Sequence, residues 1–216
     1  MAKRFTYGLA AAAMGAALLA LPPPAVIAGD SGPTPTASAA AGAAARTPTP
    51  VPRGALWIGV VLRRGAARLP GGDSVAWLPE FPAAGRITTE LAIAQRGKQF
   101  QPRVAVAAVG STVGFPNFDR VFHNVFSLSR PKAFDLGLYR GGRSKSVRFD
   151  QPGLVQVYCN IHPQMSAYLM VVDSRHHGVG DGGGTIRLEG VPTGTRRVEG
   201  WNVRAGLWSR DAVVRA

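Results

Sequence analysis

The sequence is poor in cysteine, because Cys159 is the only one in 216 residues. A single thiol cannot form an internal disulfide, and this excludes the disulfide framework on which many small secreted domains depend. Two interpretations of the thiol remain: a buried, unreactive core residue or a metal ligand. The residues around it decide between them.

Acidic residues are also scarce, with 12 Asp and Glu against 25 Lys and Arg and a formal net charge of +13. The positive charge is mostly arginine and is spread along the chain. It forms no basic run of the length that binds nucleic acid, and aromatic residues do not alternate with it. We therefore expect no nucleic-acid partner. Such a basic surface favours an acidic partner or the headgroups of an anionic membrane.

Long apolar runs are missing except near the amino terminus. A basic start and an apolar stretch over 5–21 precede Ala28, a small residue of the kind that signal peptidases prefer. We interpret residues 1–28 as a secretory signal that is cleaved after Ala28. This places the mature chain in the periplasm or outside the cell, with no stable membrane insertion. The alternative is a retained anchor, for which the run is short and is closed by three prolines at 22–24.

Extended helical periodicity is missing as well. Residues 29–53 consist mainly of Ala, Pro, Thr and Gly, a composition that predicts a disordered linker. After them, short β-branched and aromatic runs are separated by Gly, Pro, Asn and Asp, which is typical of an all-β protein built as a β-sandwich. The predicted strands cover 56–62, 74–78, 89–95, 104–108, 111–115, 123–127, 146–149, 154–159, 167–172, 185–188 and 196–203.

The stretch VYCNIHPQM, over 157–165, places the cysteine at the end of a predicted strand. Side chains alternate between the two faces of a strand, so Val155, Val157 and Cys159 share one apolar face. The thiol therefore continues a core-facing row. His162 and Met165 follow on the short loop before the next strand, where all three side chains can converge.

A d-block ion held by one thiolate needs further donors. His123, which opens a predicted strand in VFHNVFS, is the best candidate for a second imidazole. Two imidazoles, a thiolate and a weak axial thioether form a blue-copper ligand set, whereas zinc gains little from methionine. The sequence therefore predicts one copper ion held by His123, Cys159, His162 and Met165. The alternatives are a core histidine at 123 and a packing role for the methionine.

The segments YCNIHPQM and FHNVFS, with VGSTVGFPN before them, resemble the copper-binding motifs of the cupredoxins, the family of plastocyanin, pseudoazurin and amicyanin. The short Cys-x2-His-Pro-x-Met loop is most similar to that of amicyanin. The resemblance covers about residues 86–173 and extends to exported bacterial proteins described as methylamine-utilisation or plastocyanin-like. It implies a Greek-key β-sandwich and one type 1 copper ion. The segment between the two motifs is longer than its equivalent in amicyanin.

The resemblance also implies roles for residues beside the ligands. Asn124 is expected to tie the two ligand loops together, and Pro163 to stiffen the second loop. His162 is expected to pass the electron at the surface, with Pro163 and Gln164 in the docking patch. These roles describe a carrier in which electrons pass without catalysis at the copper ion.

The expected function is therefore that of a monomeric, non-enzymatic electron carrier in the periplasm. Its expected partners are redox proteins such as a c-type cytochrome or an amine dehydrogenase. The sequence contains no Cys-x-x-Cys-His for haem and no second copper ligand set. Two alternatives stay open: a copper protein for storage or delivery, and a structural exported β-sandwich.

The carboxyl-terminal segment resembles the strand, proline turn and strand of small carboxypeptidase-regulatory-like β-sandwiches, although Thr185 replaces the usual aromatic residue. Because this segment holds too few strands for a domain, we predict a split sandwich formed by 54–82 and 174–216, with the cupredoxin domain inserted at 86–173. The alternative is that the flanks are extra strands packed on the cupredoxin. The neighbouring histidines at 176–177 suggest either a second metal site or, as we favour, a solvated linker.

Overall fold

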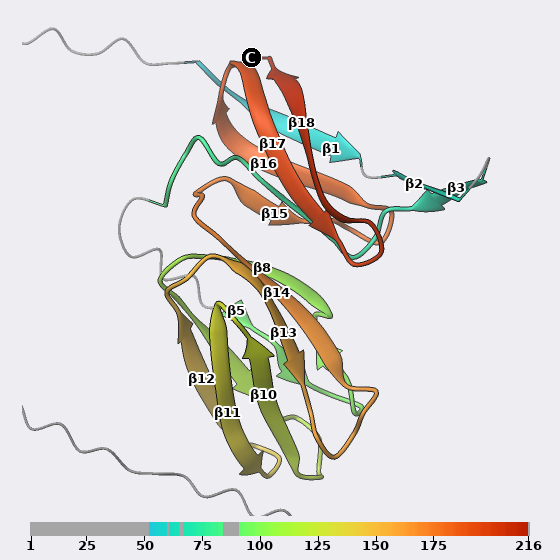
Figure 1. Cartoon of the computed structure of the whole chain (residues 1–216), viewed down its shortest axis with the longest axis vertical. Coiled ribbons are helices and arrows are strands. Elements are labelled where there is room, and N and C mark those ends of the chain that lie inside the picture. The colour runs from blue at the N-terminus through green and yellow to red at the C-terminus, as the bar shows by residue number, and fades with distance from the viewer. Residues whose placement is uncertain (1–51, 60, 65–66, 84–90, 216) are drawn as a thin grey trace, which may run out of the picture. The chain divides into compact units, whose positions relative to one another are not determined.

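Every regular element in the described part of the chain is a β-strand (Figure 1). The computed structural model describes residues 52–59, 61–64, 67–83 and 91–215. The all-β prediction is confirmed. The predicted signal and almost all of the predicted linker lie outside the described residues. Among the described residues, no helix is long and apolar enough to cross a membrane.

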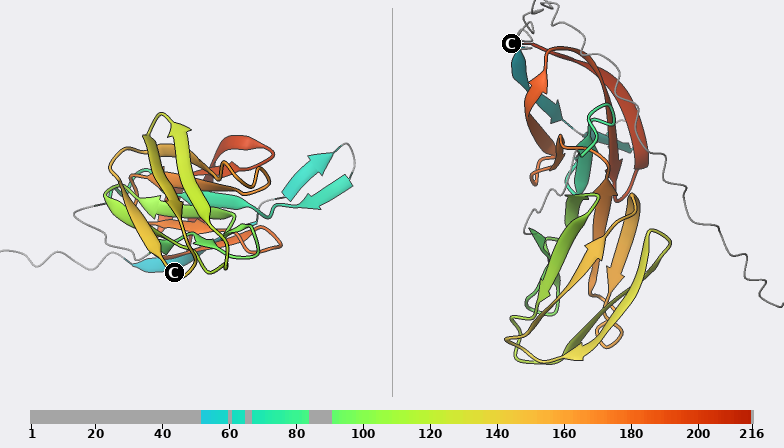
Figure 2. Two further views of the ribbon diagram at one scale, coloured as in Figure 1. Left: turned by 90° about the horizontal axis from the view of Figure 1, so that it is seen from below. Right: turned by 90° about the vertical axis from the view of Figure 1, so that its left-hand side faces the viewer.

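The larger of two sandwiches is formed by residues 91–172, whose strands run from green to orange in Figures 1 and 2. Its strands are β5 (Leu91–Ala92), β6 (Ala94–Gln95), β7 (Phe100–Gln101), β8 (Val104–Ala108), β9 (Ser111–Pro116), β10 (His123–Ser129), β11 (Lys132–Tyr139), β12 (Ser144–Phe149), β13 (Gly153–Tyr158) and β14 (Ser166–Val172). One sheet has the order β11-β10-β13-β14-β8 and the other β12-β9-β5. Strand β8 runs parallel to β14, whereas β10, β13 and β14 are antiparallel neighbours.

The core of this sandwich is filled from both sheets, and β13 contributes as its pleat predicts. Val155 and Val157 are fully buried, whereas Gln156 and Tyr158 on the other face are only half-buried. Cys159 follows the strand directly and continues the inner face, with 4% of its surface exposed. The prediction that the thiol continues an apolar face is confirmed.

Strand β11 was not among the predicted strands. It pairs with β10 along its whole length, and Phe134, Leu136 and Tyr139 pack in the core from it, whereas Ala133, Asp135, Gly137 and Leu138 are exposed. The pairing register shifts between Asn124 and Phe126, which gives β11 one extra residue near Gly137. Gly137 has φ +64° there, a left-handed conformation that glycine adopts without a steric penalty.

The smaller sandwich combines strands from both sides of the larger one in the sequence. Its core is an apolar cluster that includes Leu56, Leu78, Ile186 and Val198. The described strands outside 91–172 are β1 (Arg53–Gly59), β2 (Val61–Arg64), β3 (Ala67–Pro70), β4 (Ser74–Trp77), β15 (His177–Val179), β16 (Thr185–Pro192), β17 (Gly194–Asn202) and β18 (Gly206–Val214). Strand β1 pairs with β16, β2 pairs with β3, and β4 lies between β15 and β17. The boundaries given above for a split domain stay a prediction.

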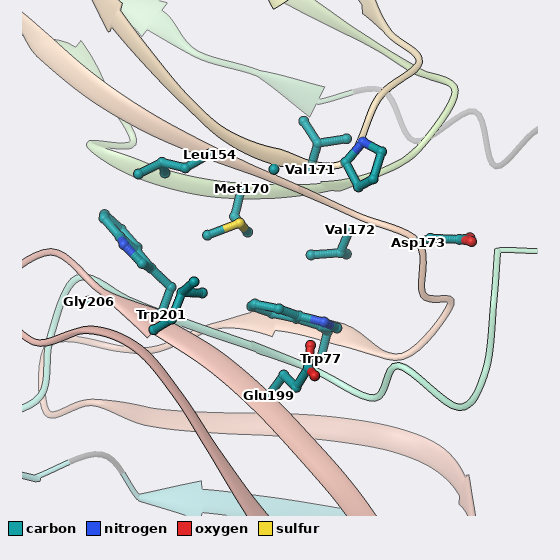
Figure 3. A pocket seen from close by; sticks show the side chains of 12 residues that line it. Trp77, Leu154, Met170, Val171, Val172, Asp173, Glu199, Trp201 and Gly206 are labelled. Atoms are coloured by element: carbon teal, nitrogen blue, oxygen red, sulfur yellow. The ribbon is translucent and has the colours of Figure 1, made fainter. Parts of the chain in front are cut away.

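A groove of about 600 Å³ lies where β4 and β17 approach β14 (Figure 3). Trp77 and Trp201 form one wall, and Met170 and Val172 of β14 stand opposite them. These four side chains belong to one buried apolar cluster. The groove therefore lies on the outer face of β14, away from the core that contains Cys159.

Candidate metal centre

The predicted ligands come from neighbouring ends of two strands and from the loop that follows the second. His123 is the first residue of β10, and Cys159 comes directly after β13. Because β10 and β13 are antiparallel neighbours, paired at Phe126 and Tyr158, the start of one lies beside the end of the other. His162 follows on the loop to β14. Pairing in the sheet thus brings residues 36 positions apart to one end of the sandwich.

The three donor groups lie close together. His123, Cys159 and His162 form a cluster in which one ligand atom of each residue lies within 4.8 Å of the others. Nδ1 of His123 is 3.1 Å from Nδ1 of His162, and Sγ of Cys159 is 4.0 Å from the same His162 nitrogen. Both imidazoles therefore turn the same ring nitrogen towards a shared point.

This spacing fits a single metal ion. A d-block ion such as zinc bonds imidazole nitrogen at about 2.0 Å and thiolate sulfur at about 2.3 Å, so one ion can reach two nitrogens and a sulfur at these separations. Asp119 stands on the far side of His123, against Nε2, and so offers no carboxylate to that point. Two imidazoles and one thiolate are soft and borderline donors, which suit copper.

Met165 closes the same loop. Its backbone N–H donates to the carbonyl of His162 at 2.9 Å, and its side chain is 1% exposed in the core cluster that also contains Cys159. The thioether is therefore held in the core at the end of the ligand loop. Its role as an axial ligand stays a prediction.

Burial differs sharply among the donors. His123 is completely buried and Cys159 is 4% exposed, whereas His162 is only half-buried. Pro163 and Gln164 are exposed beside it. The half-buried imidazole of His162 is therefore the donor group through which the site meets the solvent.

Asn124 joins the two ligand segments. Its side chain is 1% exposed, its Oδ1 accepts the N–H of Asn160 at 2.9 Å, and its Nδ2 donates to Asp135 at 2.8 Å. One bond fixes the residue after Cys159, and the other fixes the bulged strand β11. The residue that follows the first histidine thus holds the cysteine loop in place.

Asp119 was missed by the sequence analysis. Its Oδ2 lies 2.8 Å from Nε2 of His123, and its two carboxylate oxygens accept the N–H groups of Gly97 at 2.6 Å and Lys98 at 2.9 Å. The two amides come from a turn more than 20 residues earlier in the chain. The local sequence NFDRVFH does not predict the contact between Asp119 and the amides of the turn at 97–98. An acidic residue four positions before a candidate histidine ligand is only a weak signal.

The electrostatics favour a neutral imidazole at the exposed position. Desolvation lowers the pKa of His162 below its usual value, and the nearby His123 and Lys98 lower that pKa further. Desolvation raises the pKa of Asp119, but hydrogen bonds from Lys98, His123 and Gly97 outweigh it, so this pKa is lowered and the carboxylate stays ionised. Neutral imidazole is the form that binds metals.

Tyr139 lies in the core behind the thiol. Desolvation raises its pKa to about 12, against a hydrogen bond from Gln95 that lowers it, and the charge of Cys159 adds a smaller rise. Its hydroxyl donates to the carbonyl of Phe115 at 2.8 Å. A neutral, hydrogen-bonded phenol therefore borders the site on the core side.

The two ligand segments also carry exposed apolar side chains. We call Phe118, Val121, Phe122 and Ile161 the apolar patch, and their exposed fractions run from 41% to 56%. Basic residues accompany it, since the guanidinium of Arg96 lies 4.7 Å from the centre of the Phe118 ring and Lys98 acts electrostatically on His162.

The imidazoles of His176 and His177 contact different backbone groups and do not point at a common metal position. Nδ1 of His176 lies 3.1 Å from the carbonyl oxygen of Glu189, and Nδ1 of His177 lies 2.8 Å from that of Ser174. His177 opens strand β15, and His176 stacks edge-on against Phe81 at 5.1 Å. The favoured interpretation of this pair as a solvated linker is wrong, because both residues are half-buried parts of the smaller sandwich.

The chain resembles solved cupredoxins over part of its length. A purple cupredoxin from Nitrosopumilus maritimus is 23% identical, with 38% of this chain and 99% of that chain covered at a TM-score of 0.35. A mutant of amicyanin in its Cu(I) form is 20% identical, with coverages of 44% and 97% and a TM-score of 0.36. A copper-containing nitrite reductase from Thermus scotoductus SA-01 is 24% identical, with coverages of 43% and 25% and a TM-score of 0.37. No protein-family model and no curated protein matches the chain.

Proposed function

We propose that this chain is a cupredoxin that binds one type 1 copper ion and carries single electrons between redox proteins in the periplasm. One observation supports the proposal above all others: ring nitrogens of His123 and His162 and the sulfur of Cys159 lie within 4.8 Å of one another at one end of a β-sandwich. Met165, buried in the same core cluster as the thiol, completes the proposed ligand set. Such a set accommodates both oxidation states of copper.

The protein's part in electron transfer is to hold the donors still. When bound, copper supplies a centre that gains and loses one electron. His123 is fixed in β10, and Cys159 directly follows β13. The side chain of Asn124, next to His123, accepts a hydrogen bond from the backbone N–H of Asn160, next to Cys159. Donors held in this way change position little between oxidation states, so electron transfer requires little rearrangement of the protein.

The electron is proposed to enter and leave through His162. The other two donors are shielded by the protein, whereas this imidazole is half-buried and lies beside the exposed Pro163. The apolar patch lies on the two ligand segments and gives a partner an apolar surface that is easily desolvated. Contacts of this kind are small, on the order of 1,200 Å² of total buried area or less, and short-lived.

The proposed partners are redox proteins with an acidic rim, such as a c-type cytochrome or an amine dehydrogenase. Arg96, Lys98 and Arg120 are exposed beside the apolar patch. Opposite charges across such a contact raise the rate of encounter more than the affinity. Rapid encounter and rapid release are what a carrier needs.

A copper titration tests the proposal. Cu(II) added to the purified protein is expected to produce strong absorption at about 600 nm, from charge transfer between the thiolate and the metal. Cys159→Ser should abolish this band, because it removes the thiolate. Met170→Leu is the matched control, since it removes a buried sulfur from a different apolar cluster, and it should keep the band.

The outcomes separate the proposed function from its alternatives. Reversible redox cycling together with the band supports the carrier. Tight binding of Cu(I) with no visible band would favour storage or delivery of copper. Absence of copper binding would contradict both, and a band that survives in Cys159→Ser would contradict the assigned thiolate ligand.

A further inference from the structure

Asp119 makes a contact that the proposed copper chemistry does not by itself require. Its Oδ2 is 2.8 Å from Nε2 of His123, the ring nitrogen opposite to the one that faces His162. The side chain of His123 is completely buried and that of Asp119 is 15% exposed. Polar contacts at exposed surfaces contribute little because water competes for both groups, but this hydrogen bond is largely shielded from water.

The carboxylate is itself held in place from several directions. Gly97 and Lys98 donate consecutive backbone N–H groups to it, and its own N–H donates to Oδ1 of Asn117 at 3.0 Å. The side-chain amide of Asn117 in turn donates to the carbonyls of Val121 and Tyr139. These hydrogen bonds therefore fix the orientation of the Asp119 side chain, which does not rotate freely at the surface.

The turn that supplies the two amides adopts an uncommon backbone conformation. Gly97 has φ +62° and Lys98 has φ +56°. A lysine in the left-handed region is disfavoured unless surrounding contacts stabilise it. Successive N–H groups in such a turn form a concave anion-binding site, and here its anion is the carboxylate of Asp119. Residues 97–98, 119 and 123 thus form one connected chain of hydrogen bonds.

We propose that Asp119 is a positioning residue that keeps the proton of His123 on Nε2 and so leaves the lone pair of Nδ1 directed at the metal point. The inference rests on the proposed copper function, and it adds that Asp119 influences the reduction potential of the bound copper. A histidine that donates its second N–H to a carboxylate is more basic and more rigid as a ligand. An anion behind the ligand also favours the more positive Cu(II) over Cu(I).

The first test needs no metal. The ¹⁵N chemical shifts of the two ring nitrogens of His123, measured by NMR on the metal-free protein with the ring in its neutral form, report which nitrogen carries the proton. The wild type is expected to show a single form with the proton on Nε2. Asp119→Asn should give a mixture of the two tautomers. A wild-type ring protonated on Nδ1 would overturn the proposal without any variant.

Asp150→Asn is the matched control. It also removes one negative charge from the larger sandwich, but Asp150 pairs with Arg148 at 2.6 Å, both side chains are about half exposed, and neither is bonded to a ligand segment. The control should keep the wild-type tautomer and the wild-type redox properties.

The second test uses the copper-loaded protein. Asp119→Asn is expected to weaken Cu(II) binding by about 10- to 100-fold, as loss of a partner behind a metal-bound histidine does. Cu(I) binding should weaken less. A tenfold change in the ratio of the two affinities raises a one-electron reduction potential by about 59 mV. A potential and tautomer in Asp119→Asn equal to those of Asp150→Asn would overturn the proposal.

The two tests fail separately. If the wild type binds no copper, the proposed function is wrong, yet the NMR measurement still decides whether Asp119 fixes the tautomer of His123. If copper binds with the expected colour but Asp119→Asn behaves like the control, the proposed function stands and the positioning role is wrong.

Discussion

Two residues that are not proposed ligands, Asn124 and Asp119, connect the ligand segments through hydrogen bonds of their side chains. Asn124 bonds the loop after Cys159 and the neighbouring strand β11, and Asp119 bonds His123 to the turn at 97–98. Polar side chains in a core are costly to bury unless they are hydrogen-bonded, and both residues are. The site is therefore braced by groups that would not themselves touch the ion.

We predict that Asn124→Ala lowers both the stability of the protein and its affinity for copper. The substitution removes the hydrogen bonds to the carboxylate of Asp135 and from the N–H of Asn160, at a cost of about 1–3 kcal/mol in the free energy of unfolding. It also frees the loop that carries His162. Thermal unfolding of the metal-free protein and competition for copper with a chelator measure the two effects.

Asn202→Ala is the matched control for that prediction. Asn202 is also completely buried, and its side-chain amide donates to Gly72 and to Ser74 in the smaller sandwich. Its replacement should lower stability by a similar amount and leave copper affinity unchanged. Equal copper affinity in the two variants would contradict the bracing role of Asn124.

At the level of single residues, the sequence indicated the donor groups and the supporting residue Asn124, but it did not indicate Asp119. Cys159, His162 and Met165 are readable because they lie on one short loop whose preceding strand has a period of two. Asp119 was missed because its acceptor role depends on a turn more than 20 residues away in the chain. Long-range hydrogen bonds of this kind leave no periodic signal.

At the scale of elements, most strands that face the core of the larger sandwich were predicted, whereas β3, β7, β11, β15 and β18 were not. Strand β14 was expected over 167–172 and runs from Ser166 to Val172. It could be predicted because it is a continuous apolar run, of which the last four residues are buried. Strand β11 was missed because its alternation of buried and exposed residues breaks near the bulge, where Gly137 and Leu138 are both exposed. Three of its side chains, Phe134, Leu136 and Tyr139, pack in the core.

The bulge in β11 leads to a prediction about Gly137. Its left-handed backbone suits glycine, and Gly137→Ala should cost about 1 kcal/mol in stability although the added methyl group meets nothing within 4 Å. Gly114→Ala in β9 is the control, because its backbone is ordinary and its nearest contacts are at 3.9 Å. Chemical denaturation compares the two. An equal loss of stability would show that the strain at Gly137 is unimportant.

At the scale of the whole molecule, the net charge of +13, or +11 once the predicted signal with Lys3 and Arg4 is removed, should affect the rate of electron transfer. Oxidation of the reduced copper protein by anionic ferricyanide is expected to slow as ionic strength rises, because salt screens the attraction. Oxidation by the cationic tris(phenanthroline)cobalt(III) should become faster over the same range. Stopped-flow measurements with both oxidants check this, and the same salt dependence for both would contradict it.

Strand pairing between the two arms of the chain governs how the protein can be shortened. Strand β1 pairs with β16, and β4 lies between β15 and β17. A chain ending after Val172 would keep β1 and β4 but lose all of these neighbours, and unpaired strand edges promote aggregation. Expression of the larger sandwich by itself therefore requires removal of the strands on both sides of it, and a chain that ends after Val172 should be insoluble.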